Sequence, residues 1–308
     1  MLDPQAVAAL ELWAQGPSVA DPGFGPDDIA LKRAGALAAA ALEHREPMGR
    51  VEDLDANGVP CRLYVPSPVE PDPPVELVEP PGVLVFLHGG GFVFGDVETH
   101  DGQARRLANR TGQAVLAVDY RRPPEHRFPA APDDVDRAMD WLLGAAPGLG
   151  LDPRRVVALG DSAGGNLALV AALRNPGVFA ACVLIYPFLD PGTDQQSYDA
   201  SDGGLTRAEA QWFWRHYARD EADLQSSDLA PLRSEALGTL PPTLVVVAQH
   251  DVLADEDLLL ARRIQEAGVE VRCTTYPGMV HGFWRNPELF DSAEQSLVEI
   301  AAFLAETV

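Results

Sequence analysis

A serine near the middle of the chain lies in a setting that can turn its hydroxyl into a nucleophile. Ser162 is the centre of the segment 160–164, G-D-S-A-G, a G-x-S-x-G pattern. The segment follows the apolar run 156–159 and opens the helical stretch 166–173, so it predicts a tight strand-to-helix turn. Such a turn strains the backbone at the serine, and the two glycines remove side chains that would collide. The alternative is a glycine-rich turn with an incidental serine, but the placement favours a nucleophile.

Two residues further along the chain can activate this serine. A hydroxyl is a weak nucleophile until a base takes its proton. His281 follows the predicted strand 271–276 and would be that base. Asp251 follows the predicted strand 243–248 and would fix the imidazole tautomer and stabilise the imidazolium. Both positions follow the carboxyl ends of strands, as Ser162 does, so we expect a catalytic triad at one edge of a sheet.

Neighbouring residues offer alternatives for both roles. Asp255 and Glu256 lie close to Asp251, but inside the following helix, from which a side chain points less directly at the site. His250 adjoins Asp251, and other histidines are scattered at positions 44, 100, 126 and 216. The chain order serine, acid, histidine favours Asp251 and His281, because triads are known to occur in that order.

Three consecutive glycines follow the apolar run 83–87, within the sequence H-G-G-G-F at 88–92. Without side chains, their amides can converge on one point, as the oxyanion formed during acyl transfer requires. We assign the donors to Gly90, Gly91 and Ala163, the residue after the serine. A phosphate-binding loop is the alternative, but G-x-G-x-x-G would need glycine at position 94, where the chain has phenylalanine. The motif G-x-x-x-x-G-K is also missing from the sequence.

Short apolar runs alternate with helical patterns from about residue 83 onward. The runs are rich in Val, Leu and Ile and nearly continuous in apolar character, which is typical of parallel strands buried on both faces. They cover 83–87, 114–118, 156–159, 182–186, 243–248 and 271–276. The stretches between them carry apolar residues on one helical stripe. This alternation predicts an α/β fold with a mostly parallel central sheet flanked by helices on both faces.

Composition narrows the partners and the compartment. The 308 residues carry a formal net charge of −23, and Lys32 is the only lysine. Such a field disfavours nucleic acid, anionic membranes and polyanionic substrates. We expect no membrane helix, because no apolar run is long enough, and no secretory signal, so we predict a cytoplasmic protein. Three widely spaced cysteines suggest neither a disulfide framework nor a metal site.

Taken together, the motifs resemble the hormone-sensitive-lipase-like family of α/β-hydrolases, the microbial esterases often called family IV. The matching segments occur in order between about residues 83 and 284: H-G-G-G-F at 88–92, D-Y-R at 119–121 with P-E-H at 124–126, G-D-S-A-G-G-N at 160–166, A-P-L at 230–232 before Ser234, Asp251, and H-G-F at 281–283. The resemblance implies the α/β-hydrolase fold with an eight-stranded sheet. It also implies hydrolysis of short- to medium-chain carboxylic esters through an acyl-enzyme intermediate, without a cofactor.

The chain departs from the family pattern at two places. The usual Tyr-Arg-Leu-Ala-Pro-Glu reads Y-R-R-P-P-E at 120–125, and the usual Asp-Pro-Leu-Arg-Asp-Glu reads D-V-L-A-D-E at 251–256. Neither change removes a catalytic group, although the second alters the loop that aims Asp251.

The resemblance also implies a helical cap. Residues 1–50 and 190–233 would form it, and residues 51–189 and 234–308 would form the catalytic domain. The second cap segment carries an aromatic cluster, and ester pockets are mostly apolar. We expect Trp212, Tyr217 and Phe92 to line the substrate pocket, with ordinary packing of the cap as the alternative. We expect Asp161 to support the serine turn through hydrogen bonds.

The predicted function is therefore that of a serine carboxylesterase acting on a small-molecule ester. An amide, a lactone or a thioester remains open as the physiological target, because all share the acyl-enzyme. A non-catalytic binding protein is another alternative, since the plant gibberellin receptors resemble this family after losing the histidine that this chain retains as His281. The sequence shows no self-complementary surface patch, so it does not determine the oligomeric state; a homodimer is one possibility.

Overall fold

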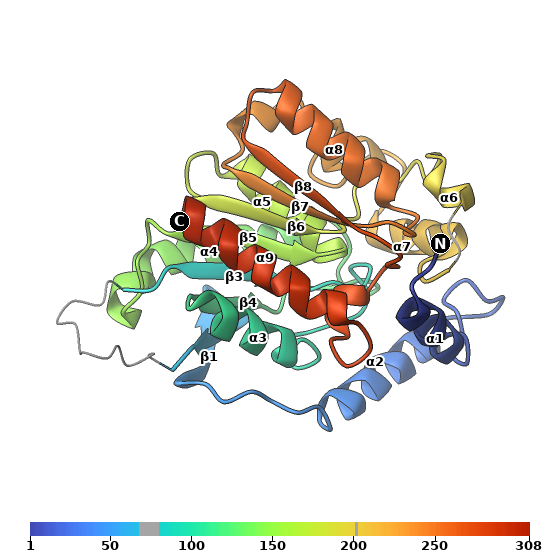
Figure 1. Cartoon of the computed structure of the whole chain (residues 1–308), viewed down its shortest axis with the longest axis horizontal. Helices are drawn as coiled ribbons and strands as arrows, with labels where there is room; N and C mark the ends of the chain where they lie inside the picture. The colour runs from blue at the N-terminus through green and yellow to red at the C-terminus, as the bar shows by residue number, and fades with distance from the viewer. Residues whose placement is uncertain (68–79, 201–202) are drawn as a thin grey trace.

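Eight strands form a single sheet in the computed structural model of the chain (Figure 1), which describes residues 1–67, 80–200 and 203–308. The strand order is β1-β2-β4-β3-β5-β6-β7-β8. The first two strands pair antiparallel with their neighbours, and all later pairs are parallel. The strands are β1 (Arg50–Ala56), β2 (Val59–Val65), β3 (Val83–Leu87), β4 (Ala114–Val118), β5 (Val156–Asp161), β6 (Ala181–Ile185), β7 (Thr243–Ala248) and β8 (Val271–Tyr276).

Helices cover both faces of this sheet, as the sequence predicts. Because side chains alternate along a strand, β3 sends Val83, Val85 and Leu87 into one core and Leu84 and Phe86 into the other. The first core is completed by α4 (Ala130–Leu149), α5 (Ala163–Arg174) and α8 (Ala254–Glu266). The second is completed by α3 (Asp101–Thr111) and α9 (Asp291–Thr307), which lie in front of the sheet in Figure 1. The predicted α/β fold with a mostly parallel sheet is confirmed.

The N-terminal segment and the insertion after β6 gather at one end of the sheet, on the right in Figure 1. They contact each other, since the Ser18 hydroxyl donates to Glu209 over 2.7 Å and Phe24 packs edge-on against Trp212. Their helices are α1 (Pro4–Trp13), α2 (Pro26–Ala40), α6 (Ser197–Ala200) and α7 (Arg207–Tyr217), and short 3₁₀ turns follow at Asp223–Gln225, Pro231–Arg233, Leu237–Thr239 and Phe283–Arg285.

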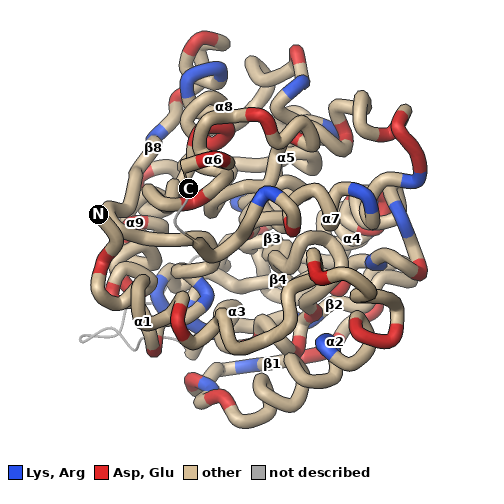
Figure 2. Tube along the Cα trace, turned by 90° about the vertical axis from the view of Figure 1, so that its right-hand side faces the viewer, with Lys and Arg blue, Asp and Glu red and all other residues tan. Residues whose placement is uncertain are grey.

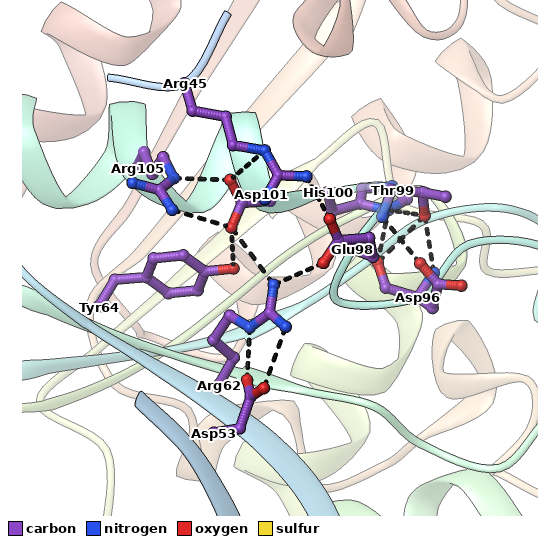
Figure 3. Close-up of polar contacts among 10 residues, drawn as sticks. All are labelled: Arg45, Asp53, Arg62, Tyr64, Asp96, Glu98, Thr99, His100, Asp101 and Arg105. Atoms are coloured by element: carbon purple, nitrogen blue, oxygen red, sulfur yellow. Dashed lines mark hydrogen bonds and ion pairs between the residues drawn. The ribbon is translucent and has the colours of Figure 1, made fainter. Parts of the chain in front are cut away.

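A cluster of charges fixes the segment before β1 to the sheet (Figure 3). At its centre the buried carboxylate of Asp101 accepts hydrogen bonds from the Tyr64 hydroxyl (2.9 Å) and from Nε of Arg105 (2.6 Å). The guanidinium groups of Arg45 and Arg62 lie 3.4 and 3.5 Å from the same carboxylate. These contacts join the N-terminal segment, β2 and α3 around one carboxylate, which we call the Asp101 cluster.

Charge of both signs is spread over the outer helices and loops on the side that Figure 2 shows. Among the residues that the structure describes, no helix combines the length and the apolar character needed to cross a bilayer.

Candidate active site

Ser162 stands at the sharp turn between β5 and α5. Its backbone adopts φ 53° and ψ −118°, a conformation that costs a non-glycine residue free energy and is typical of functional sites. A Cβ atom at Gly160 would collide with the carbonyl of Gly164, and one at Gly164 with the carbonyl of Leu87. The two glycines of the motif are therefore required by packing, and they allow the turn to approach β3.

The structure brings the three predicted triad residues together. His281 Nε2 lies 3.0 Å from Ser162 Oγ, and His281 Nδ1 lies 2.6 Å from Asp251 Oδ2. The carboxylate of Asp251 is completely buried, and its other oxygen accepts the backbone N–H of Leu253 over 3.1 Å. A carboxylate against Nδ1 favours the tautomer that carries its proton there. Nε2 is then free to accept the serine proton.

Backbone pairing between two loops holds the acid and the base in register. The N–H of His250, beside Asp251, donates to the carbonyl of Met279, two residues before His281, over 2.8 Å. Gly282 follows His281 at φ 84°, in the left-handed region that favours glycine, and turns the chain into the short helix Phe283–Arg285. The loops after β7 and β8 thus converge at the same end of the sheet.

The alternative acids serve the backbone of the insertion. Glu256 is fully buried and accepts the N–H groups of Leu189 (2.9 Å) and Asp190 (3.2 Å). Asp255 accepts the N–H of Ser197 over 2.8 Å. Burial raises the pKa of Glu256 well above its ordinary value. Both side chains therefore hold the chain after β6, whereas Asp251 holds the imidazole.

The glycine loop faces the serine across a small cavity. Gly90 and Gly91 adopt φ values of 116° and 60°, and both line the cavity that contains Ser162 Oγ. Within the described part of the chain, the N–H groups of these two glycines make no hydrogen bond, so they are available to a ligand. Ala163 begins α5, and its N–H belongs to the first turn, where amides lack helical partners.

Asp161 connects the serine turn to the glycine loop. Its Oδ1 atom accepts the N–H of Gly89 over 2.8 Å. On the other side of the loop, the Tyr120 hydroxyl donates to the carbonyl of His88 over 2.7 Å, and the two rings stack at 4.3 Å. Burial lowers the pKa of His88 to about 3, so this imidazole is neutral. Asp161 thus joins the serine turn to the glycine loop 88–92 through one hydrogen bond.

The cavity at the triad has a volume of about 140 Å³. Its walls are mainly apolar, with a few polar groups at one end, which is the usual composition of a small-molecule site. The lining residues are Gly90, Gly91, Asp161, Ser162, Tyr186, Phe188, Leu205, Phe213, His281, Gly282 and Arg285.

The three aromatic residues predicted to line this pocket do not border it. Phe92 and Tyr217 are fully buried and stack on each other with ring centroids 3.7 Å apart. Trp212 packs against Phe24 of the N-terminal segment. It is Phe213 that reaches the cavity from α7. The sequence did not single out Phe213, because the aromatic residues of α7 occupy several neighbouring positions, and the pattern does not show which of them faces the cavity.

Four other cavity residues were not predicted from the sequence: Tyr186, Phe188, Leu205 and Arg285. A signal existed for Tyr186, because it directly follows β6 at the edge where the triad lies. Arg285 lies four residues after His281, but nothing in its sequence neighbours indicates that the chain turns back into the cavity there.

Comparisons of the sequence and of the structure with known proteins place this chain among the α/β-hydrolase esterases. The sequence matches the family described as alpha/beta hydrolase fold over residues 84–285. It is 34% identical over 259 residues to an ethyl acetate hydrolase of Pseudomonas putida, covering 82% of this chain and 80% of that protein. It is 31% identical to an arylesterase of Saccharolobus solfataricus, covering 85% of each. A solved esterase structure from Pyrobaculum calidifontis superimposes with a TM-score of 0.86 at 33% identity, covering 100% of both chains.

Proposed function

Because the chain belongs to the α/β-hydrolase fold family, among its hormone-sensitive-lipase-like ester hydrolases, we propose a two-step serine esterase mechanism for it. The substrates are short- to medium-chain carboxylic esters. The observation that carries the proposal is the unbroken relay from Ser162 through His281 to Asp251, with contacts of 3.0 and 2.6 Å.

In the first step, Ser162 Oγ attacks the ester carbonyl while His281 Nε2 takes its proton. Asp251 stabilises the imidazolium that forms. The carbonyl oxygen becomes an oxyanion, and the N–H groups of Gly90, Gly91 and Ala163 stabilise it. His281 then protonates the leaving alcohol, and the acyl group remains on the serine.

In the second step, water replaces the alcohol. His281 removes a proton from the water, the resulting hydroxide attacks the acyl-enzyme, and the same amides stabilise the second oxyanion. Collapse of this intermediate releases the carboxylic acid and returns the proton to Ser162. No cofactor takes part in either step.

The size of the cavity supports a preference for small acyl groups. About 140 Å³ of apolar space beside Ser162 holds only a few carbon atoms. Leu205 and Phe213, which close this space, belong to the insertion after β6. We therefore assign acyl-chain selection to a cap built from residues 1–50 and 190–233.

The first prediction concerns the nucleophile. Ser162→Ala should lower turnover of 4-nitrophenyl acetate and butyrate by about 10⁶-fold, because the attacking oxygen is lost. Ser234→Ala is the matched control, since that hydroxyl is also buried but accepts a hydrogen bond from the backbone of Ala236. A fluorophosphonate should label the wild type at the peptide containing Ser162 and leave Ser162→Ala unmodified. Substantial activity in Ser162→Ala, or labelling of another serine, would overturn the assignment.

A panel of acyl lengths and leaving groups refines the substrate class. Among 4-nitrophenyl esters, we expect kcat/KM to fall from the short and medium chains to palmitate. An amide, a lactone and a thioester of the same acyl group compete as physiological targets, since the intermediate is shared. A palmitate preference would contradict the role of the small cavity.

A further inference from the structure

One cationic side chain lines the cavity without an ion-pair partner among the described residues. Arg285 lines the same space as Ser162 and His281. Its Nε atom is buried and has no hydrogen-bond partner. Within the described ranges, no acidic side chain lies at ion-pair distance from its guanidinium. The backbone of Arg285 is held in place, because its carbonyl accepts a hydrogen bond from Gln103 Nε2 over 2.9 Å.

The groups around Arg285 leave its charge largely unmatched. Burial raises the pKa of Asp161 and lowers the pKa values of His88 and His100; the positive charge of Arg285 opposes the first shift and adds to the other two. Burial nevertheless keeps the pKa of Asp161 above its ordinary value, and that carboxylate already accepts the N–H of Gly89. Both histidines have lowered pKa values and contribute no charge near neutrality. The guanidinium of Arg285 therefore has no ion-pair partner among the described residues, although Asp161 lines the same cavity.

A second cavity continues from this corner. It measures about 260 Å³ and shares Gly90 and Arg285 with the first, and its wall also includes Lys32. The guanidinium of Arg33, on the same wall, is already engaged by Val93, Pro123 and Glu125. The full lining is Lys32, Arg33, Ala36, Gly90, Phe94, Gly95, Asp96, Thr99 and Arg285.

The acidic residue on this wall is already engaged. Asp96 Oδ1 accepts the N–H of Thr99 over 2.7 Å, and Oδ2 lies 3.9 Å from the guanidinium of Arg122. The only lysine of the chain and Arg285 thus border a space that adjoins the cavity of Ser162.

We infer that Arg285 is a specificity-determining residue that binds a carboxylate carried by the ester substrate. The inference rests on the proposed function, because it names the substrate class of that same site. Ser162 attacks the ester carbonyl, and a carboxylate elsewhere on the molecule accepts hydrogen bonds from the guanidinium near Gly90. A planar guanidinium matches a carboxylate in two parallel hydrogen bonds, which Lys32 could reinforce only as a point charge.

The net charge of the protein makes a local cation important for binding an anionic substrate. A net charge of −23 repels any anionic ester from the surface. A local cation in a largely apolar cavity reverses that preference at short range, where screening by salt is weakest. We therefore expect anionic esters to be accepted only through Arg285.

The test compares an anionic ester with a neutral ester of similar size, in two pairs. The first pair is 4-nitrophenyl hemiglutarate and 4-nitrophenyl pentanoate, which carry the difference in the acyl group. The second pair is acetoxyacetate and propyl acetate, which carry it in the alcohol. In at least one pair, kcat/KM of the wild type should favour the anionic ester.

Substitution then assigns the preference to one side chain. Arg285→Gln should lower the ratio of anionic to neutral kcat/KM at least tenfold, mainly through KM, and Arg285→Lys should restore part of it. Arg272→Gln is the charge-matched control, because Arg272 is partly exposed, does not line the cavity, and pairs with Glu306 near the end of α9. It should leave the ratio unchanged.

Several outcomes would overturn the inference. These are a wild type that prefers the neutral ester in both pairs, an Arg285→Gln enzyme that loses both members of a pair equally, or an Arg272→Gln enzyme that loses the preference as well. If Arg285→Gln does not fold, Arg285→Lys decides the matter, because the loss of the planar guanidinium should lower the ratio of anionic to neutral kcat/KM while turnover of the neutral ester persists. Failure of the wild type to cleave any neutral ester would instead refute the proposed function.

Discussion

The segment 88–101 contributes Gly90 and Gly91 to the cavity at Ser162 and Asp101 to the Asp101 cluster. The charged side chains of these two regions are paired to different degrees. In the cluster, one buried carboxylate is surrounded by a tyrosine hydroxyl and three guanidinium groups (Figure 3). In the cavity, a guanidinium with a buried Nε has no acidic partner among the described residues. Matched charges fix one arrangement of the chain, whereas an unmatched charge is free to interact with a ligand.

This contrast assigns different consequences to similar substitutions. A carboxylate removed from the cluster should cost stability, because its cationic partners remain without it. A carboxylate removed from the triad should cost activity, because it orients the base and not the fold. The three predictions below test this division, beginning with the largest effect.

The triad carboxylate should matter for catalysis far more than for folding. Asp251→Asn should lower kcat for 4-nitrophenyl butyrate by about 10⁴-fold, because an amide next to His281 Nδ1 favours the wrong tautomer. The circular dichroism spectrum and the thermal midpoint should stay near those of the wild type. A loss of folding that matches the loss of activity would remove the distinction between the two regions.

The cluster carboxylate should show the opposite behaviour. Asp101→Asn should lower the free energy of unfolding by about 2–3 kcal/mol, somewhat below the cost of breaking a fully buried pair, since its arginine partners remain partly hydrated. Urea denaturation measures this, and kcat of the folded enzyme should remain within about twofold. Asp53→Asn is the control, because its side chain is 72% exposed and should change stability by less than about 1 kcal/mol.

The smallest effect concerns acid stability at His100, which lies between the two regions. Burial lowers the pKa of this imidazole well below its ordinary value, and its ring lies 5.0 Å from that of His88. The folded protein therefore leaves His100 neutral where the unfolded chain, with a pKa near 6.5, binds a proton. The stability that neutral His100 contributes is complete above pH 6.5 and is lost as the pH falls towards the folded pKa.

A substitution isolates this contribution. His100→Gln should reduce the drop in unfolding free energy between pH 7 and pH 5 by about 2 kcal/mol, the linkage of one proton over that interval. Buried acids with raised pKa values, among them Glu256 and Asp257, act in the opposite sense but equally in both proteins. An unchanged pH dependence would show that His100 is not the acid-sensitive group.

The sequence predicts the central sheet well because burial on both faces leaves a continuous apolar run. The strands β3 to β8 are therefore legible, although β8 is only partly buried. The edge strands escape this criterion. β1 has the sequence R-V-E-D-L-D-A and is mostly exposed. Its charged residues interrupt the apolar pattern, so the sequence did not predict the strand or its pairing with β2.

The positions of the triad were predictable for a related reason. Parallel strands end at one edge, so residues placed just after them must meet, as Ser162 and His281 do at 3.0 Å. The cavity wall follows no such rule. Phe213 and Arg285 reach it through the packing of an inserted helix and the turn of a short loop, which depend on contacts distant in sequence.

The bond between Asp161 and Gly89 has a consequence for how the molecule moves. It joins the residue before Ser162 to the loop of Gly90 and Gly91, the amide donors that we propose for the oxyanion, across 72 positions of the chain. This hydrogen bond does not involve the helices α1, α2 and α7, so a movement of those helices would leave it in place. Substitutions in the N-terminal segment or in the insertion after β6 can therefore change substrate selectivity without changing the positions of Ser162 and Gly90, which are set by the ends of β5 and β3.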